Sequence, residues 1–159
     1  MKRRPWALLL AAWLAGCAAA APPEAAAPFP ATVPERVSID GRDYTLEAYL
    51  WRNFMPGPDP GRRGLIALVW LTAADGRPVD HHLTLEGLWL VRDGEIRAMR
   101  FSDEPRPMEP RRRHQLERIA RDGPLWPTGI RVDVIVRIQD SRGKTYWLRL
   151  PRQPIHRTV

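Results

Sequence analysis

The stretch that decides the fold is residues 130–150, which read IRVDVIVRIQDSRGKTYWLRL. Apolar and polar residues alternate from Val132 to Ile138, and the alternation resumes from Tyr146 to Leu150 after a loop that contains Ser and Gly. Alternation with a period of two predicts strands with one buried face, and the loop between them predicts a β-hairpin. The buried face of such a hairpin needs cover, so a second layer of structure is expected.

Shorter runs nearer the N-terminus extend this pattern. Leu65–Leu71 is wholly apolar, which predicts a central strand buried on both faces and places Trp70 in the core. Asp93-Gly94 is a typical hairpin turn between two of the runs. Six to eight short strands over residues 37–159 predict an all-β domain built as an antiparallel β-sandwich. The further predicted strands are Tyr44–Leu50, Leu83–Val91 and Glu95–Phe101.

One segment, residues 111–121, could form either a short helix or a polar loop. Leu116, Ile119 and Ala120 would share one helical face, and Gly123 would end the helix; a polar loop is the alternative. The predicted strands resemble immunoglobulin-like and transthyretin-like sandwiches, in architecture only. The chain has a single cysteine, so no internal disulfide accompanies that resemblance.

The first sixteen residues have the form of a signal peptide. A positive stretch, Lys2-Arg3-Arg4, precedes an apolar run that is too short to span a bilayer. Leu14-Ala15-Gly16-Cys17 then resembles the lipobox of bacterial lipoproteins. The resemblance implies that residues 1–16 are removed and that Cys17 carries the lipid anchor; an ordinary cleaved signal with an incidental cysteine is the alternative. Ala18 after the cysteine implies the outer membrane, facing the periplasm, in a bacterium with two membranes.

Residues 17–36 comprise the lipidated cysteine and an Ala- and Pro-rich stretch, which predicts an extended tether to the domain. The net charge is +7, and removal of Lys2, Arg3 and Arg4 with the signal lowers it by three to +4. No long block of like charge is present, so we expect no nucleic-acid partner.

No residue set predicts catalysis. The serines lack the nucleophile-elbow pattern. Asp103, Glu104 and Glu109 could form an acid–base pair, but they lie among arginines, which favours a solvated and mutually neutralised loop. We therefore expect a protein that is not an enzyme.

Asp80-His81-His82 is the one candidate for metal binding. Neighbouring residues on a strand point to opposite faces, so the two histidines would share an ion only if the segment is a loop. A metal site also needs three or four converging ligands. The sequence therefore favours a solvated turn, and we expect no metal site and no cofactor.

Aromatic residues give the strongest indication of a binding surface. Trp51, Phe54 and Met55 lie at the end of a predicted strand and could form a patch for a partner, with packing between two sheets as the alternative. Together these features predict a lipid-anchored envelope protein that binds or scaffolds a protein or an envelope polymer. The alternatives are a periplasmic carrier of a metal or small ligand and, less favoured, an enzyme that acts on envelope polymers.

Overall fold

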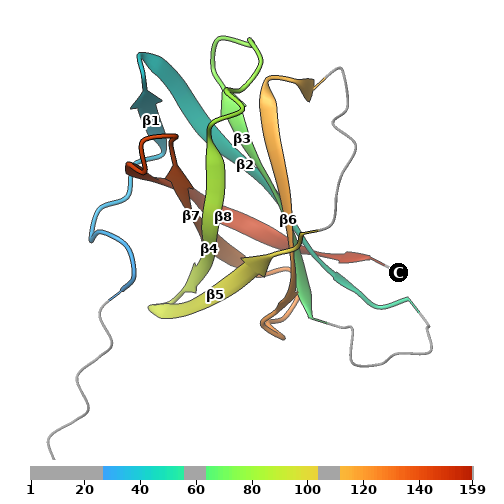
Figure 1. The fold of residues 1–159 in the computed structure, drawn as a ribbon. Helices are drawn as coiled ribbons and strands as arrows, with labels where there is room; N and C mark the ends of the chain where they lie inside the picture. The colour runs from blue at the N-terminus through green and yellow to red at the C-terminus, as the bar shows by residue number, and fades with distance from the viewer. Residues whose placement is uncertain (1–26, 56–63, 104–111, 159) are drawn as a thin grey trace, which may run out of the picture.

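The computed structural model describes residues 27–55, 64–103 and 112–158, and Cys17 with the predicted signal peptide lies outside them. The described residues form eight β-strands and no α-helix (Figure 1), and none contains a helix long and apolar enough to cross a membrane. The strands are β1 (Arg36–Ile39), β2 (Arg42–Asn53), β3 (Leu65–Ala73), β4 (Thr84–Arg92), β5 (Glu95–Phe101), β6 (Gln115–Gly123), β7 (Arg131–Gln139) and β8 (Thr145–Thr158).

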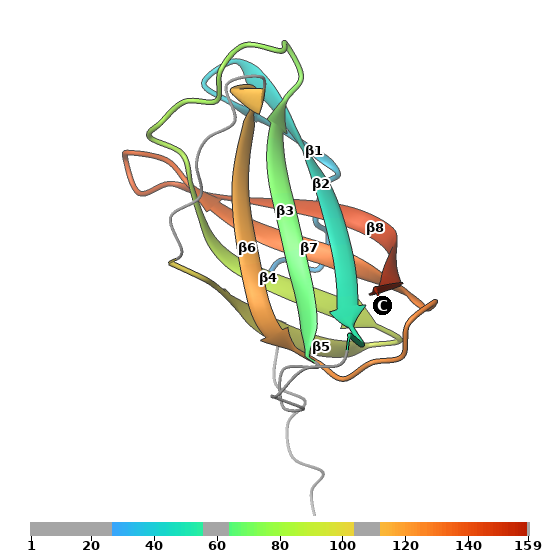
Figure 2. The same cartoon turned by 90° about the vertical axis from the view of Figure 1, so that its right-hand side faces the viewer.

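Seven of the strands close into a β-barrel, so the predicted β-sandwich is wrong. Their order around the wall is β2-β3-β6-β5-β4-β7-β8, and β8 returns to pair with β2 (Figure 2). The closing pair is parallel, with Leu50 opposite Ile155 and Asn53 opposite Thr158; every other neighbouring pair is antiparallel. Closure leaves a single wall with an inner and an outer face, so no second sheet covers the outside.

The length of β8 makes the closure feasible. Its first part pairs with β7, from Thr145 opposite Gln139 to Pro154 opposite Arg131, and the ladder shifts register between Val132 and Val134. Such a bulge bends a strand and increases its twist. The last four residues of the strand therefore reach β2, on the edge whose first part is occupied by β1.

The predicted hairpins are confirmed. β4 and β5 pair across Asp93 and Gly94, whose φ values of 48° and 83° fit a turn that matches strand twist. β7 and β8 pair across the loop at 140–144.

The helix predicted at 111–121 is wrong, because Gln115–Gly123 forms β6. This strand pairs with β3 over seven residue positions, from Thr72 opposite Gln115 to Leu65 opposite Gly123. In the barrel, β3 and β5 supply backbone hydrogen-bond partners to this segment, and the local sequence pattern does not reveal them.

Apolar side chains fill the barrel. Along β3 the inner residues Leu65, Ala67, Val69 and Leu71 have no exposed surface. The alternate residues of β3 point outward and are only half-buried, so the prediction of a strand buried on both faces, with Trp70 in the core, is wrong. Instead, the Trp70 indole nitrogen donates to Glu117 Oε2 at 2.6 Å on the outer face.

The segment before β1 lies against the outer wall. Phe29 makes edge contacts with Trp89 and Trp147, each with ring centroids 6.2 Å apart, and these two indoles lie 5.3 Å from one another. Trp89 lies over Gly87, where a Cβ atom would collide with the indole ring. The backbone N–H of Arg149 on β8 donates to the Pro34 carbonyl at 2.8 Å. Part of the Pro-rich stretch therefore covers one outer aromatic cluster of the barrel.

Candidate functional site

A second aromatic cluster lies on the outer wall where β8 closes onto β2. The parallel register places Trp51 beside His156, and alternation puts Tyr49 on the same face. The Tyr49 ring stacks on the His156 ring with centroids 4.7 Å apart and planes 16° apart. Its centroid lies 5.4 Å from that of Trp51. Three rings from two strands therefore form one continuous aromatic surface.

Strand β3 extends this surface with aliphatic side chains. Ile66 is the register partner of Trp51, and Leu68 is the partner of Tyr49. Both are half-buried, whereas Tyr49 keeps 41% of its surface exposed. We call the five residues the outer aromatic patch: Tyr49, Trp51, Ile66, Leu68 and His156. The patch exists because the apolar run of β3 continues on the outer face of a wall that has no second sheet over it.

Cationic side chains lie at the end of the seam, on the opposite strand face from the patch, because Arg52 and Arg157 follow the inward-facing Leu50 and Ile155 by two residues. The Phe54 ring lies between two guanidinium groups, with Arg52 Cζ 5.1 Å and Arg157 Cζ 4.7 Å from its centroid. The Phe54 backbone N–H donates to the Thr158 carbonyl at 2.9 Å, which fixes the ring beside the end of β8. Beyond it, Met55 is 59% exposed.

The structure thus assigns different surroundings to the three residues that the sequence suggested. Trp51 belongs to the patch, Phe54 lies between strand ends beside Arg52 and Arg157, and Met55 is exposed. Sequence reasoning missed Tyr49 and His156. Tyr49 had a usable signal, since it lies two residues before Trp51 and therefore on the same strand face. His156 had none, because its place depends on a pairing between strands about a hundred residues apart.

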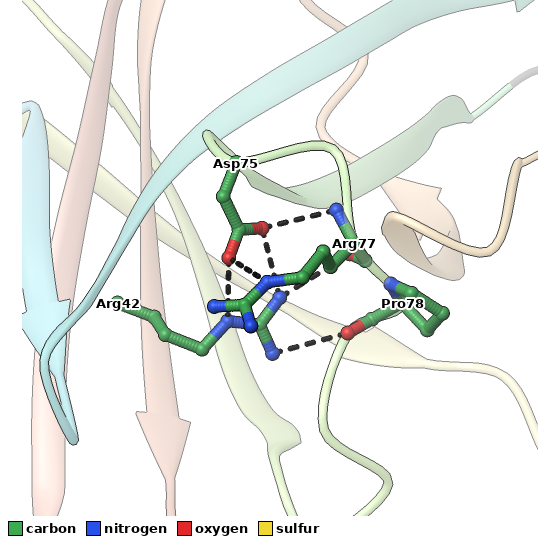
Figure 3. A network of polar contacts seen from close by, with 4 residues as sticks. All are labelled: Arg42, Asp75, Arg77 and Pro78. Carbon is green, nitrogen blue, oxygen red and sulfur yellow. Dashed lines mark hydrogen bonds and ion pairs between the residues drawn. The ribbon is translucent and has the colours of Figure 1, made fainter.

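The strongest ion-pair network lies elsewhere, at the loop after β3 (Figure 3). Arg42 donates from two nitrogens to the Asp75 carboxylate, at 3.0 and 2.9 Å, and Arg77 donates to the same carboxylate at 2.8 Å. Arg42 also donates to the Pro78 carbonyl at 3.1 Å. Hydrogen bonds from Arg42 and then Arg77 hold the pKa of Asp75 well below its usual range. This network ties the start of β2 to the loop, and its groups satisfy one another.

Asp140 performs a similar structural role in the β7–β8 turn. Its carboxylate is 7% exposed and accepts hydrogen bonds from the backbone N–H groups of Arg142 and Lys144, both at 2.9 Å, and from the Tyr146 hydroxyl at 3.2 Å. Burial raises the pKa of Asp140, but these hydrogen bonds lower it further than burial raises it. The carboxylate therefore stays ionised and holds the turn together.

The loop between β3 and β4 brings Asp80, His81 and His82 together. The segment is a turn, in which the Leu83 N–H donates to the Asp80 carbonyl at 3.1 Å. The two imidazole rings lie 3.8 Å apart between centroids, and all three side chains are exposed.

The acidic loop is described only at its start. Asp103 is exposed and lies 3.9 Å from Arg118, whereas Glu104 and Glu109 lie outside the described residues. A shallow hollow near Asp103 follows the junction of β5 and β6, which pair at only two positions, Arg100 with Arg121 and Phe101 with Ala120. Ser102 lines this hollow, and the described lining brings no histidine to it.

Comparisons with protein-family models, with curated proteins and with solved structures find no match to this chain.

Proposed function

We propose that this chain is a lipid-anchored protein of the cell envelope, attached through Cys17, and that its barrel binds a partner protein at the outer aromatic patch without catalysing a reaction. In a bacterium with two membranes the anchor would lie in the outer membrane and the barrel would face the periplasm. The observation that carries the binding proposal is the contiguous aromatic and aliphatic surface of Tyr49, Trp51 and His156 with their β3 neighbours.

The composition of the patch favours a protein over other partners. Trp, Tyr and Arg are the residues most enriched among those that dominate binding energy at protein interfaces. The patch contains the first two of these. Aromatic rings of this kind supply a large contact area and lose little side-chain entropy on binding.

The molecule itself shows how such a patch can be covered. Elsewhere on the outer wall, Phe29 from a Pro-rich segment contacts the indoles of Trp89 and Trp147. Among the described residues, the N-terminal segment thus covers this aromatic cluster and leaves the outer aromatic patch uncovered. We infer that the partner presents a similar segment to the outer aromatic patch, with an apolar side chain at its centre.

Site-specific cross-linking in the native envelope tests this proposal. A photo-crosslinking residue in place of Tyr49, in the full chain, should yield one discrete protein adduct. The same residue in place of the exposed Glu86 on β4 is the matched control and should yield none. Adding Trp51→Ala to the Tyr49 position should remove the adduct, since truncation of a dominant interface residue costs about 2 kcal/mol or more, or roughly 30-fold in affinity.

Three outcomes would contradict parts of the proposal. Equal adducts from positions 49 and 86 would show that contact is unspecific, and a protease-resistant polymer adduct at position 49 would replace the protein partner with an envelope polymer. The wild-type chain should fractionate with membranes, and its Cys17→Ser variant should not. Retention of the variant on membranes would overturn the lipid anchor and leave the patch proposal standing.

A further inference from the structure

The geometry points to a second binding site, for a divalent transition-metal ion, formed by Asp80, His81 and His82 in the loop between β3 and β4. The class of ligand is a cation that prefers imidazole nitrogen, such as Zn²⁺ or Cu²⁺. The site is separate from the outer aromatic patch and does not depend on the proposed function.

Adjacent histidines on a strand would point to opposite faces and could not share an ion. In the structure these residues are in a turn that two hydrogen bonds define: the Leu83 N–H donates to the Asp80 carbonyl, and the His82 N–H donates to Asp80 Oδ1 at 2.9 Å. The turn places both imidazoles on one side, 3.8 Å apart between centroids. The geometric objection therefore does not apply to this loop.

The donor atoms lie close to the spacing that one ion requires. One ligand atom from each of the three residues lies within 4.8 Å of the other two. Zinc binds imidazole nitrogen and carboxylate oxygen tetrahedrally at about 2.0–2.2 Å, so two such ligands lie about 3.3–3.6 Å apart. The donor atoms must therefore approach one another by up to about 1.5 Å, which rotation of the exposed side chains about their χ angles can supply.

The set of donors also fits the chemistry of these metals. Two imidazoles and one carboxylate leave at least one coordination position open to water, as in sites with three protein ligands. The nearby cations oppose binding only weakly, because Arg42 and Arg77 are both paired with the Asp75 carboxylate. His81 Nδ1 already lies 3.7 Å from Asp80 Oδ1.

Calorimetric titration of the full chain in detergent with Zn²⁺, and separately with Cu²⁺, tests the site. We expect one equivalent to bind. Loss of an outer-shell partner of a metal ligand typically weakens affinity by about 10–100-fold, so His81→Ala and His82→Ala should each weaken binding by at least ~10-fold. His114→Ala is the matched control that removes an imidazole outside this set, and it should bind as the wild type does.

Electron paramagnetic resonance tests whether the imidazole nitrogens coordinate the metal directly or whether the substitutions act only by changing the charge of the loop. Cu²⁺ bound to the wild-type chain should show electron paramagnetic hyperfine splitting from two imidazole nitrogens, and the His82→Ala complex should show one. Absence of binding heat for both metals, or binding that survives both single substitutions unchanged, would overturn the proposal and leave a solvated turn. Because all three residues are exposed, the variants should retain wild-type thermal unfolding, which excludes misfolding as the cause of lost binding.

Discussion

Replacing Ile155 by alanine should lower the free energy of unfolding by about 2–4 kcal/mol, the range for truncating a fully buried aliphatic side chain. Ile155 is 1% exposed and lies opposite Leu50, which has no exposed surface, in the parallel seam that closes the barrel. Its N–H also donates to the Ile130 carbonyl at 3.0 Å. The side chain is therefore packed between β2 and β7 at the point where the wall is joined.

Chemical denaturation of the Ile155→Ala and His156→Ala variants provides the comparison. His156 is the adjacent residue on the same strand, but it points outward and stacks on Tyr49, so its removal should cost about 1 kcal/mol or less. A cost for Ile155→Ala equal to that of His156→Ala would mean that the seam is not closed, because an open sheet edge would leave both side chains in water.

Local sequence pattern was sufficient for the hairpins and insufficient for the closure. The β4–β5 and β7–β8 pairs join runs that are adjacent in sequence, and each is connected by a turn with its own chemical signature, such as Asp93-Gly94. The β2–β8 pair joins residues 50–53 to 155–158, and no short-range pattern encodes a parallel contact of that separation. Alternation along strands is the same in a sandwich and a barrel, so it could not distinguish them.

The segment Gln115–Gly123 is a second case in which local sequence pattern did not determine the structure. Its apolar residues Leu116, Ile119 and Ala120 fit a helical face, but the structure pairs the segment with β3. Ala67 lies opposite Ala120 there, so the strand buries a small residue against a small residue. Pairing with the free edge of β3 decides the outcome, and the local pattern of residues 115–123 carries no information about that edge.

The candidate surfaces, like the fold, could be predicted only in part from the sequence. Trp51 could be placed on an outer face from alternation alone, whereas its neighbour His156 depends on the barrel closure. Trp70 was expected in the core because the run around it is apolar, but its indole lies outside and donates to Glu117. An apolar run indicates burial on both faces only if something covers both, and a single barrel wall covers one.

Among the connecting segments that the structure describes, Trp126 is expected to stabilise the barrel most, and Trp126→Ala should cost about 3–5 kcal/mol. The residue lies between β6 and β7, is 8% exposed and belongs to the core cluster. Its indole N–H donates to Glu95 Oε2 on β5 at 3.2 Å, and its carbonyl accepts from Arg52 Nη1 on β2 at 3.0 Å. It therefore connects two strands that are not neighbours in the wall.

The reason for so large an effect is that the indole is packed in the core cluster, so its truncation leaves a cavity, and its hydrogen bond to Glu95 is lost as well. Trp126→Phe keeps most of the ring and loses one hydrogen bond, so it should cost about 1 kcal/mol. Leu125→Ala, at a side chain that is 70% exposed, should change stability by about 0.5 kcal/mol or less. Denaturant unfolding that shows equal costs for Leu125→Ala and Trp126→Ala would mean that this end of the barrel is held by the strands alone.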